Sequence, residues 1–238
     1  MQREYIRLPK REILPDSSKK KRALTDDFWI NLIHYHLLKF FKEYDRNELK
    51  ALIASEKAKL SRKHIEDDIK DYMKKWFETY DKQIFRQGLL INLESKVKYN
   101  QTGFYDIKFQ HSDWVDGDNK VSKYYPFECK NLNSKKASFD EYVFNKAKTD
   151  GGIYRYFNGK YAQKQDFGGM LGFVLEGNRT NAMTRVISSI NSTFNTLSEG
   201  TLIKNGIQLN SIENNEFTFS SIHQRGTTQC KLVILNRI

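Results

Sequence analysis

The spacing of apolar residues changes near residue 89, and this change constrains the fold more than any other feature of the 238-residue chain. Before it, apolar residues recur every three or four positions, as they do on one face of a helix. After it come short runs rich in aromatic and β-branched residues, which are typical of strands. These runs cover residues 89–99, 103–109 and 124–132. The pattern therefore predicts helices first and then three consecutive strands.

Two helices are predicted before the change. Thr25 is a suitable N-cap, and Asp26 and Asp27 follow it in the first turn, where negative charge is favoured. The apolar stripe of this helix consists of Trp29, Ile33, Leu37 and Phe40. A second helix is predicted over residues 61–80, and Glu66 lies beside its apolar stripe.

The second half of the chain alternates between helical and strand patterns. Ser138 and Glu141 have the spacing of a capping box, and Asn181 is a suitable cap for a later helix. Strands are predicted over residues 168–176, 217–220 and 231–235. This order predicts a mixed α/β fold in which helices flank a mixed sheet. We expect residues 1–24 to form a basic N-terminal arm and residues 25–238 to form a single domain, with a helical extension before its core.

The chain is strongly basic, with 40 Lys and Arg against 29 Asp and Glu and a net charge of +11. A basic protein most often meets a polyanion, because neutralising phosphates releases condensed counterions. We therefore expect a nucleic-acid partner. No apolar run reaches the roughly 20 residues of a spanning helix, and the N-terminus lacks the apolar segment of a secretory signal. These features predict a cytoplasmic protein with no membrane partner.

Charged residues that suit phosphodiester chemistry lie on two neighbouring predicted strands. Asp106 is in the second strand, and Glu128 and Lys130 are in the third. Residues two apart on a strand share a face, so Glu128 and Lys130 point one way while Phe127 and Cys129 point into apolar packing. Carboxylate oxygens are the ligands that Mg²⁺ prefers, and a nearby lysine can orient the attacking water. The arrangement indicates metal-assisted hydrolysis of a phosphodiester.

Residues 103–107 and 124–130 resemble the two motif segments of the PD-(D/E)XK nuclease superfamily, the restriction-endonuclease-like fold. The resemblance covers residues 61 to about 176 and implies an αβββαβ core, which we place within about 61–200. Two features depart from the superfamily pattern. No Pro precedes Asp106, and the Gln-x-x-x-Tyr pattern of the RecB-like branch is missing after Lys130.

The same resemblance implies roles for individual residues. Mg²⁺, for which Mn²⁺ substitutes, would be held by Asp106 and Glu128, with the carbonyl of Cys129 as a further ligand. Lys130 would act on the water. Many members add a Glu from the helix before the first strand, and in this chain Glu66 has that position.

Other readings of the same residues stay open. The tripeptide Asp/Glu-x-Lys is common in this chain, where it begins at Glu48, Asp68, Glu94, Asp106, Asp118 and Glu128. A rival register takes Glu94 as the first acid and Asp106 with Lys108 as the second motif. The aromatic lead-in and the small Cys129 favour Glu128, as expected for a buried central strand. The charged residues would otherwise form ordinary cross-strand ion pairs on a solvent face.

Two further groups are candidates for contacts with nucleic acid. Arg155 and Lys160 lie in a segment of mixed basic and aromatic residues, 154–161, which is also typical of an edge strand with a turn at Asn158-Gly159. His223 and Arg225 alternate along a late strand and would share one face.

Together these features predict a metal-dependent endonuclease that hydrolyses phosphodiester bonds, with DNA as the expected substrate. The superfamily makes restriction or antiphage defence a frequent setting, and double-strand cutting favours a homodimer. Two alternatives remain, namely a basic nucleic-acid-binding module without cleavage and an accessory subunit with a nuclease-like fold.

Overall fold

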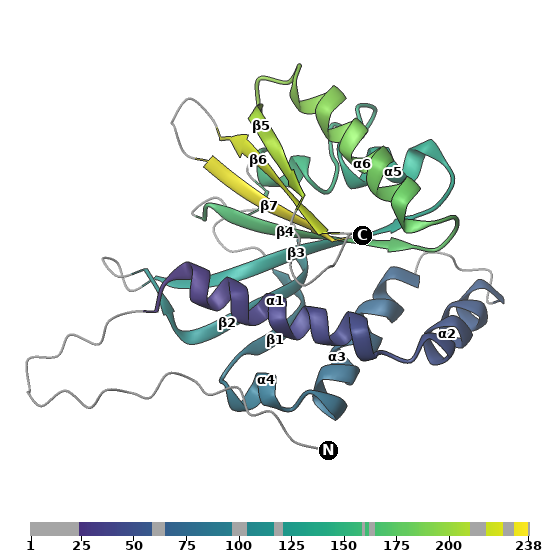
Figure 1. The fold of residues 1–238 in the computed structure, drawn as a ribbon, viewed down its shortest axis with the longest axis vertical. Coiled ribbons are helices and arrows are strands. Elements are labelled where there is room, and N and C mark those ends of the chain that lie inside the picture. Colours follow the sequence, from purple (N-terminus) through teal and green to yellow (C-terminus); the bar gives the residue numbers. More distant parts are fainter. Residues whose placement is uncertain are drawn as a thin grey trace, which may run out of the picture.

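The protein folds around one seven-stranded mixed sheet flanked by helices, so the predicted mixed α/β class is confirmed (Figure 1). The computed structural model describes residues 24–58, 65–96, 104–116, 121–158, 160–161, 165–209, 218–225 and 231–237. The predicted basic arm lies outside these residues, except for Leu24.

The sheet has the strand order β1-β2-β3-β4-β7-β6-β5. Its strands are β1 (Leu90–Lys96), β2 (Phe104–Val115), β3 (Ser122–Leu132), β4 (Phe167–Val174), β5 (Leu202–Leu209), β6 (Thr218–Gln224) and β7 (Lys231–Arg237). β4 pairs in parallel with both of its neighbours, β3 and β7, whereas the remaining pairs are antiparallel. Parallel pairing from β3 to β4 requires a crossover, and the segment between them supplies it.

Helices cover both faces of the sheet (Figure 1). They are α1 (Asp26–Glu43), α2 (Arg46–Ala58), α3 (Ile65–Tyr80), α4 (Gln83–Arg86), α5 (Lys136–Tyr142), a 3₁₀ helix η1 (Tyr154–Tyr156) and α6 (Arg179–Phe194). α1 and α3 pack against one apolar cluster of the sheet, and α5 and α6 pack against the other. From α3 to β4, the elements follow in the order α3-α4-β1-β2-β3-α5-η1-β4.

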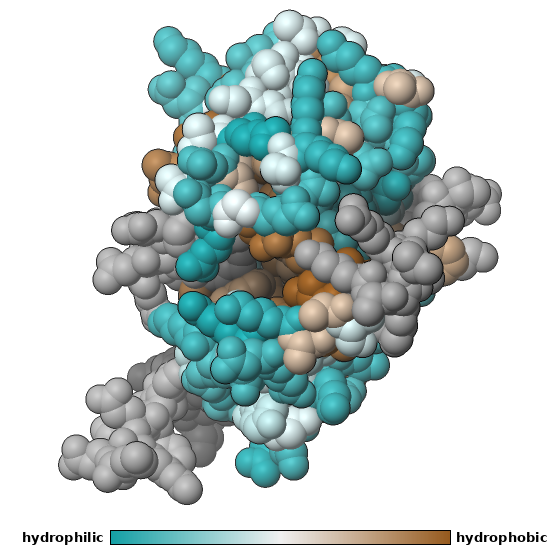
Figure 2. Space-filling model, turned by 90° about the vertical axis from the view of Figure 1, so that its right-hand side faces the viewer, coloured by the Kyte–Doolittle hydropathy of each residue, from teal (hydrophilic) through white to brown (hydrophobic). Residues whose placement is uncertain are grey.

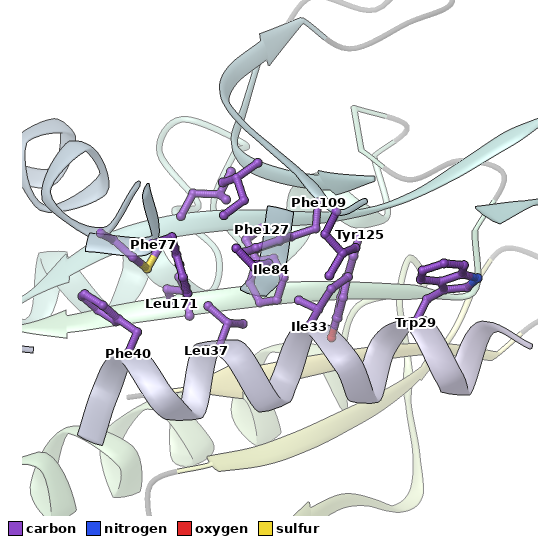
Figure 3. Packing of buried hydrophobic residues seen from close by; sticks show 14 of the residues in the cluster. Trp29, Ile33, Leu37, Phe40, Phe77, Ile84, Phe109, Tyr125, Phe127 and Leu171 are labelled. Atoms are coloured by element: carbon purple, nitrogen blue, oxygen red, sulfur yellow. The ribbon is translucent and has the colours of Figure 1, made fainter. Parts of the chain in front are cut away.

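The predicted stripe of α1 lies against the sheet, as Figure 3 shows. Ile33 and Leu37 are fully buried there, in a cluster that includes Phe109 of β2, Tyr125 of β3 and Phe77 of α3. Burying one such side chain contributes about 1.5–3 kcal/mol. The first turn is capped as expected, because the Thr25 side chain accepts a hydrogen bond from the amide of Phe28. α1 is therefore a layer of the core rather than an appendage to it.

The segment after α1 differs from the prediction. The chain turns at Tyr44, whose backbone is extended, and continues as α2, a helix that the apolar spacing did not indicate. Asp45 is the missed signal, because its Oδ1 accepts hydrogen bonds from the amides of Asn47 and Glu48. This is the behaviour of an N-cap residue.

The capping box at Ser138 was a wrong prediction. α5 begins two residues earlier, at Lys136, so Ser138 lies inside the helix. Its hydroxyl accepts from the amide of Asn133 and donates to the carbonyl of Lys135. The hydroxyl therefore holds the turn that leads from β3 into α5.

The segment that begins at Tyr154 was also predicted wrongly as an edge strand, because residues 154–156 form the helix η1. Tyr154 and Tyr156 are buried there. The two aromatic rings therefore pack in the interior of the crossover from β3 to β4.

The three consecutive strands are confirmed, with β2 longer than predicted. Pro126 lies inside β3 rather than at its start, but the pairing of β3 with β4 begins only at the next residue, Phe127. A missing amide hydrogen is tolerated at such a position. β5 was not predicted, since only Gly206 of its residues is buried and its pattern is weak.

On the face that Figure 2 shows, hydrophilic side chains surround a hollow in which apolar side chains gather. Among the described residues, no helix combines the length and the apolar character that crossing a membrane requires.

His223 on β6 is completely buried, so the prediction that it contacts nucleic acid does not agree with its position. Its ring packs against Phe157 and Phe194, and its Nδ1 donates to the carbonyl of Gly200 at 2.8 Å. Burial lowers the pKa of His223 from 6.5 to about 4, against the small opposing effect of that hydrogen bond.

The burial of neutral His223 predicts a pH-dependent stability. Because the unfolded chain binds a proton near pH 6.5 and the folded chain only near pH 4, stability is complete above pH 6.5 and falls as the pH drops toward 4. The full loss is about 3 kcal/mol. Urea unfolding across this range measures it. His223→Asn retains a hydrogen-bond donor but does not titrate, so the free energy of unfolding of this variant should change less with pH. An unchanged pH dependence would assign the effect to other groups.

Candidate active site

Asp106 and Glu128 lie side by side on the neighbouring strands β2 and β3. The register pairs Ile107 with Phe127, so the two acidic residues occupy the next position on each strand. Asp106 Oδ2 accepts a hydrogen bond from the backbone amide of Cys129 at 2.6 Å. The structure thus brings together the two carboxylates that strand alternation predicted.

The carboxylate of Glu128 is almost completely buried, with 1% of the side chain exposed. Its Oε1 lies 2.6 Å from Lys130 Nζ and 2.5 Å from Arg155 Nη1. Its Oε2 is buried and has no hydrogen-bond partner among the described residues. Burial raises the pKa of Glu128, and the negative charge of Asp106 adds to this, although Lys130 and Arg155 act against it. Oε2 of Glu128 could therefore bind a further ligand.

Lys130 connects the strands to helix α3. Its Nζ lies 3.6 Å from Glu66 Oε1 and donates to the carbonyl of Cys129 at 2.7 Å. Burial alone would lower the pKa of Lys130, but Glu128, Glu66 and Asp106 raise it, so the ammonium stays charged. Burial raises the pKa of Glu66 to about 7, in spite of Lys130. Glu66, predicted only from the resemblance, thus faces the same cluster.

Cys129 has two different environments. Its side chain is fully buried in the apolar cluster with Phe127, as alternation predicted. Its carbonyl, the predicted metal ligand, accepts from Lys130.

Lys70 on α3 was missed by the sequence reasoning. Its side chain is 3% exposed, and its Nζ lies 3.0 Å from Asp106 Oδ1, 2.7 Å from Asp67 Oδ1 and 3.8 Å from Glu94 Oε1. Burial would lower the pKa of Lys70, but the carboxylates of Asp106 and Asp67 raise it. The available signal was a lysine next to Ile69, on the buried face of the helix and one turn after Glu66.

Arg155 contacts carboxylates rather than an open surface. Its Nε and Nη2 donate to the two oxygens of Asp150 at 3.0 and 2.9 Å, while Nη1 reaches Glu128. The hydrogen bonds from Arg155 hold the pKa of Asp150 well below its usual range, although burial acts in the opposite direction. Lys160, the neighbouring candidate for nucleic-acid contact, lies 3.3 Å from Asp150. Arg155 therefore contacts Glu128 and Asp150, whereas the contact of Lys160 is with Asp150.

Arg225, the last of the candidates for contact with nucleic acid, lies apart from these contacts. Its Nη1 donates to the carbonyl of Gln165 at 2.9 Å. The structure thus gives it a partner in the chain segment just before β4.

The contacts favour Glu128 over the rival register. Lys108, the lysine of that register, has its Nζ 5.7 Å from the centre of the Tyr124 ring. Lys130, in contrast, contacts Glu128 directly and lies near Glu66. Glu94 is 63% exposed and approaches Lys70.

The donor set fits a hard divalent cation, because Asp106, Glu128 and Glu66 provide carboxylate oxygens and the buried Oε2 of Glu128 lacks a partner. Within the described part of the chain, however, no three His, Cys, Asp or Glu side chains are already arranged to hold a metal ion. The reason is visible in the contacts, since Lys70 is bound to Asp106 and Lys130 and Arg155 are bound to Glu128.

Comparison with known proteins does not identify the chain. No protein-family model, no curated protein and no solved structure matches it.

The Arg155–Glu128 pair predicts a measurable coupling. Arg155→Met leaves a buried carboxylate with one cation fewer and should lower the free energy of unfolding by about 2–4 kcal/mol. Glu128→Gln removes that charge, so the double variant should be more stable than the sum of the single effects by about 1–2 kcal/mol. Urea denaturation of the four proteins measures this.

Arg185→Met is the matched control, because Arg185 is exposed and stacks on Phe139. Its loss should cost less than about 1 kcal/mol. Additive effects of Arg155→Met and Glu128→Gln would contradict the coupling.

Proposed function

We propose that the protein is a Mg²⁺-dependent nuclease of the PD-(D/E)XK type, which hydrolyses phosphodiester bonds of nucleic acid, with DNA as the substrate. The observation that carries the proposal is the placement of Asp106 and Glu128 on neighbouring strands, with the ammonium of Lys130 in contact with Glu128.

The residues of the cluster have distinct roles in this proposal. Asp106, Glu128 and Glu66 would hold the cation, which when bound polarises the phosphodiester and lowers the pKa of a water molecule. Lys130 orients the attacking water and offsets the negative charge that develops on phosphorus. Its charged state suits this role, since the surrounding carboxylates keep its pKa raised.

Two properties of the whole chain support the proposal. Apart from the short helices α4 and η1, the element order α3-β1-β2-β3-α5-β4 agrees with the core that the resemblance to the superfamily implies. The net charge of +11 suits a polyanionic substrate, because lysines and arginines bind phosphates and release counterions. Restriction or antiphage defence is the setting that the resemblance suggests, and double-strand cutting would favour a homodimer.

The test is cleavage of supercoiled plasmid by the purified protein in Mg²⁺, in Mn²⁺ and in EDTA. Cleavage is expected with either metal and not in EDTA. Asp106→Asn, Glu128→Gln and Lys130→Met should each lower the rate at least about 100-fold, as removal of a metal ligand or an electrostatic contact in the transition state does. Circular dichroism checks that each variant is folded.

Lys148→Gln is the control, because Lys148 forms an exposed ion pair with Glu141 and should leave the rate unchanged. Full activity of Asp106→Asn or Lys130→Met would reject the assignment of the site, and cleavage that persists in EDTA would reject the metal-dependent mechanism.

A second candidate is a nucleic-acid-binding protein without cleavage. The observation in its favour is that cations of the chain itself, Lys70, Lys130 and Arg155, already compensate Asp106 and Glu128. This candidate predicts DNA binding that weakens steeply with salt and no turnover in Mg²⁺ or Mn²⁺. Fluorescence anisotropy at several salt concentrations, on the same preparation as the cleavage assay, distinguishes the two.

A further inference from the structure

We propose that Lys70 is a resident cation of the site, which a divalent metal ion must displace from Asp106, and that Lys70 thereby sets the metal affinity of the protein. This inference rests on the proposed function, because it assumes that Asp106 is a metal ligand. It adds a residue and an effect that the resemblance does not supply.

The position of Lys70 is fixed by the fold. The side chain extends from α3 and is 97% shielded from solvent, since only 3% of it is exposed. Its ammonium lies 3.0 Å from Oδ1 of Asp106, which is itself mostly buried. A lysine this deep loses its hydration and is retained only where carboxylates replace the water.

Both carboxylate oxygens of Asp106 have partners within the protein. Oδ1 faces the Lys70 ammonium, and Oδ2 accepts from the amide of Cys129 at 2.6 Å. The backbone amide belongs to the sheet and stays in place. A dication that binds Asp106 therefore meets a positive charge within a few ångströms, and the two repel strongly in a partly buried site.

Lys70 also contacts two other carboxylates, which stay within reach if its ammonium moves away from Asp106. Its Nζ lies 2.7 Å from Asp67 and 3.8 Å from Glu94, and both of these carboxylates are more exposed than Asp106. Glu94 adopts a positive φ of 48°, which is unfavourable for a residue with a side chain. A cavity of about 230 Å³ is lined by Asp67, Lys70, Asp71, Leu93 and Glu94. The ammonium can therefore move toward solvent without losing all of its ion pairs.

Lys130 does not have the same relation to Asp106. Among the described residues, its ammonium contacts Glu128, Glu66 and the carbonyl of Cys129, so it stays at the cluster when Asp106 exchanges its partner. The two lysines thus have different roles in this proposal. Lys130 serves the chemistry, and Lys70 occupies Asp106 until a metal ion arrives.

The experiment is isothermal titration of the full-length protein with MnCl₂ alone, in the absence of nucleic acid. Lys70→Gln removes the competing charge and should tighten Mn²⁺ binding by roughly tenfold or more, because a nearby unit charge no longer repels the dication. Lys70→Met tests the same loss with an apolar side chain of similar length, and Lys70→Arg should keep the affinity of the wild type. Asp106→Asn should abolish binding at this site.

Lys39→Gln is the matched control. Lys39 also pairs with a buried carboxylate, Asp81 at 2.9 Å, but this pair lies just beyond the opposite end of α3. Its removal should leave the Mn²⁺ affinity unchanged. Thermal unfolding with and without Mn²⁺ verifies that each variant is folded and gives a second readout, since a tighter ligand raises Tm further.

The outcomes separate this inference from the proposed function. Unchanged or weaker Mn²⁺ binding in both Lys70→Gln and Lys70→Met, with cleavage that still depends on Asp106, would overturn the role of Lys70 alone. Absence of Mn²⁺ binding in the wild type and in both variants, together with absence of cleavage, would overturn both.

Discussion

The structure depends on compensating one buried carboxylate, that of Glu128 in the central strand β3. A buried acid without a partner costs several kcal/mol, so the surrounding chain must supply positive charge or the acid must be protonated. Lys130 comes from the same strand and Arg155 from the crossover to β4. Arg155 is in turn held by Asp150 through two parallel hydrogen bonds, a geometry that fixes a guanidinium firmly. The crossover and the site are therefore one electrostatic unit.

The sheet explains why these charges converge. β3 pairs with β2 on one side and with β4 on the other, so Glu128 has Asp106 next to it and the crossover close by. Helix α3 then brings Glu66 and Lys70 to the same place. Acidic and basic side chains alternate through the cluster, and its ion pairs include contacts within β3 and within α3 as well as contacts between α3, the strands and the crossover. Removing one charge will disturb several neighbours at once.

Strand alternation was enough to predict the local part of the site. It placed Glu128 and Lys130 on one face and Cys129 on the other, because side-chain direction on a strand follows from the backbone alone. It could not predict Lys70 or the pairing of Arg155 with Glu128, because these contacts join elements separated by long stretches of chain. The prediction that His223 contacts nucleic acid was wrong for a related reason. Alternation indicated a face of β6, but the packing of α6 and η1 decided that this face is buried.

The net charge of +11 describes the whole chain but not the surroundings of Asp106 and Glu128. Lysine and arginine are in excess over the chain, yet around Asp106 and Glu128 the carboxylates outnumber the cations, since Glu66, Asp67, Glu94 and Asp150 join them. Lys70, Lys130 and Arg155 compensate part of this concentration of acid with positive charges of the chain itself. A dication at Asp106 would then have to exchange with an existing ion pair rather than fill a gap, and such exchange makes its affinity adjustable through a residue that takes no part in the chemistry.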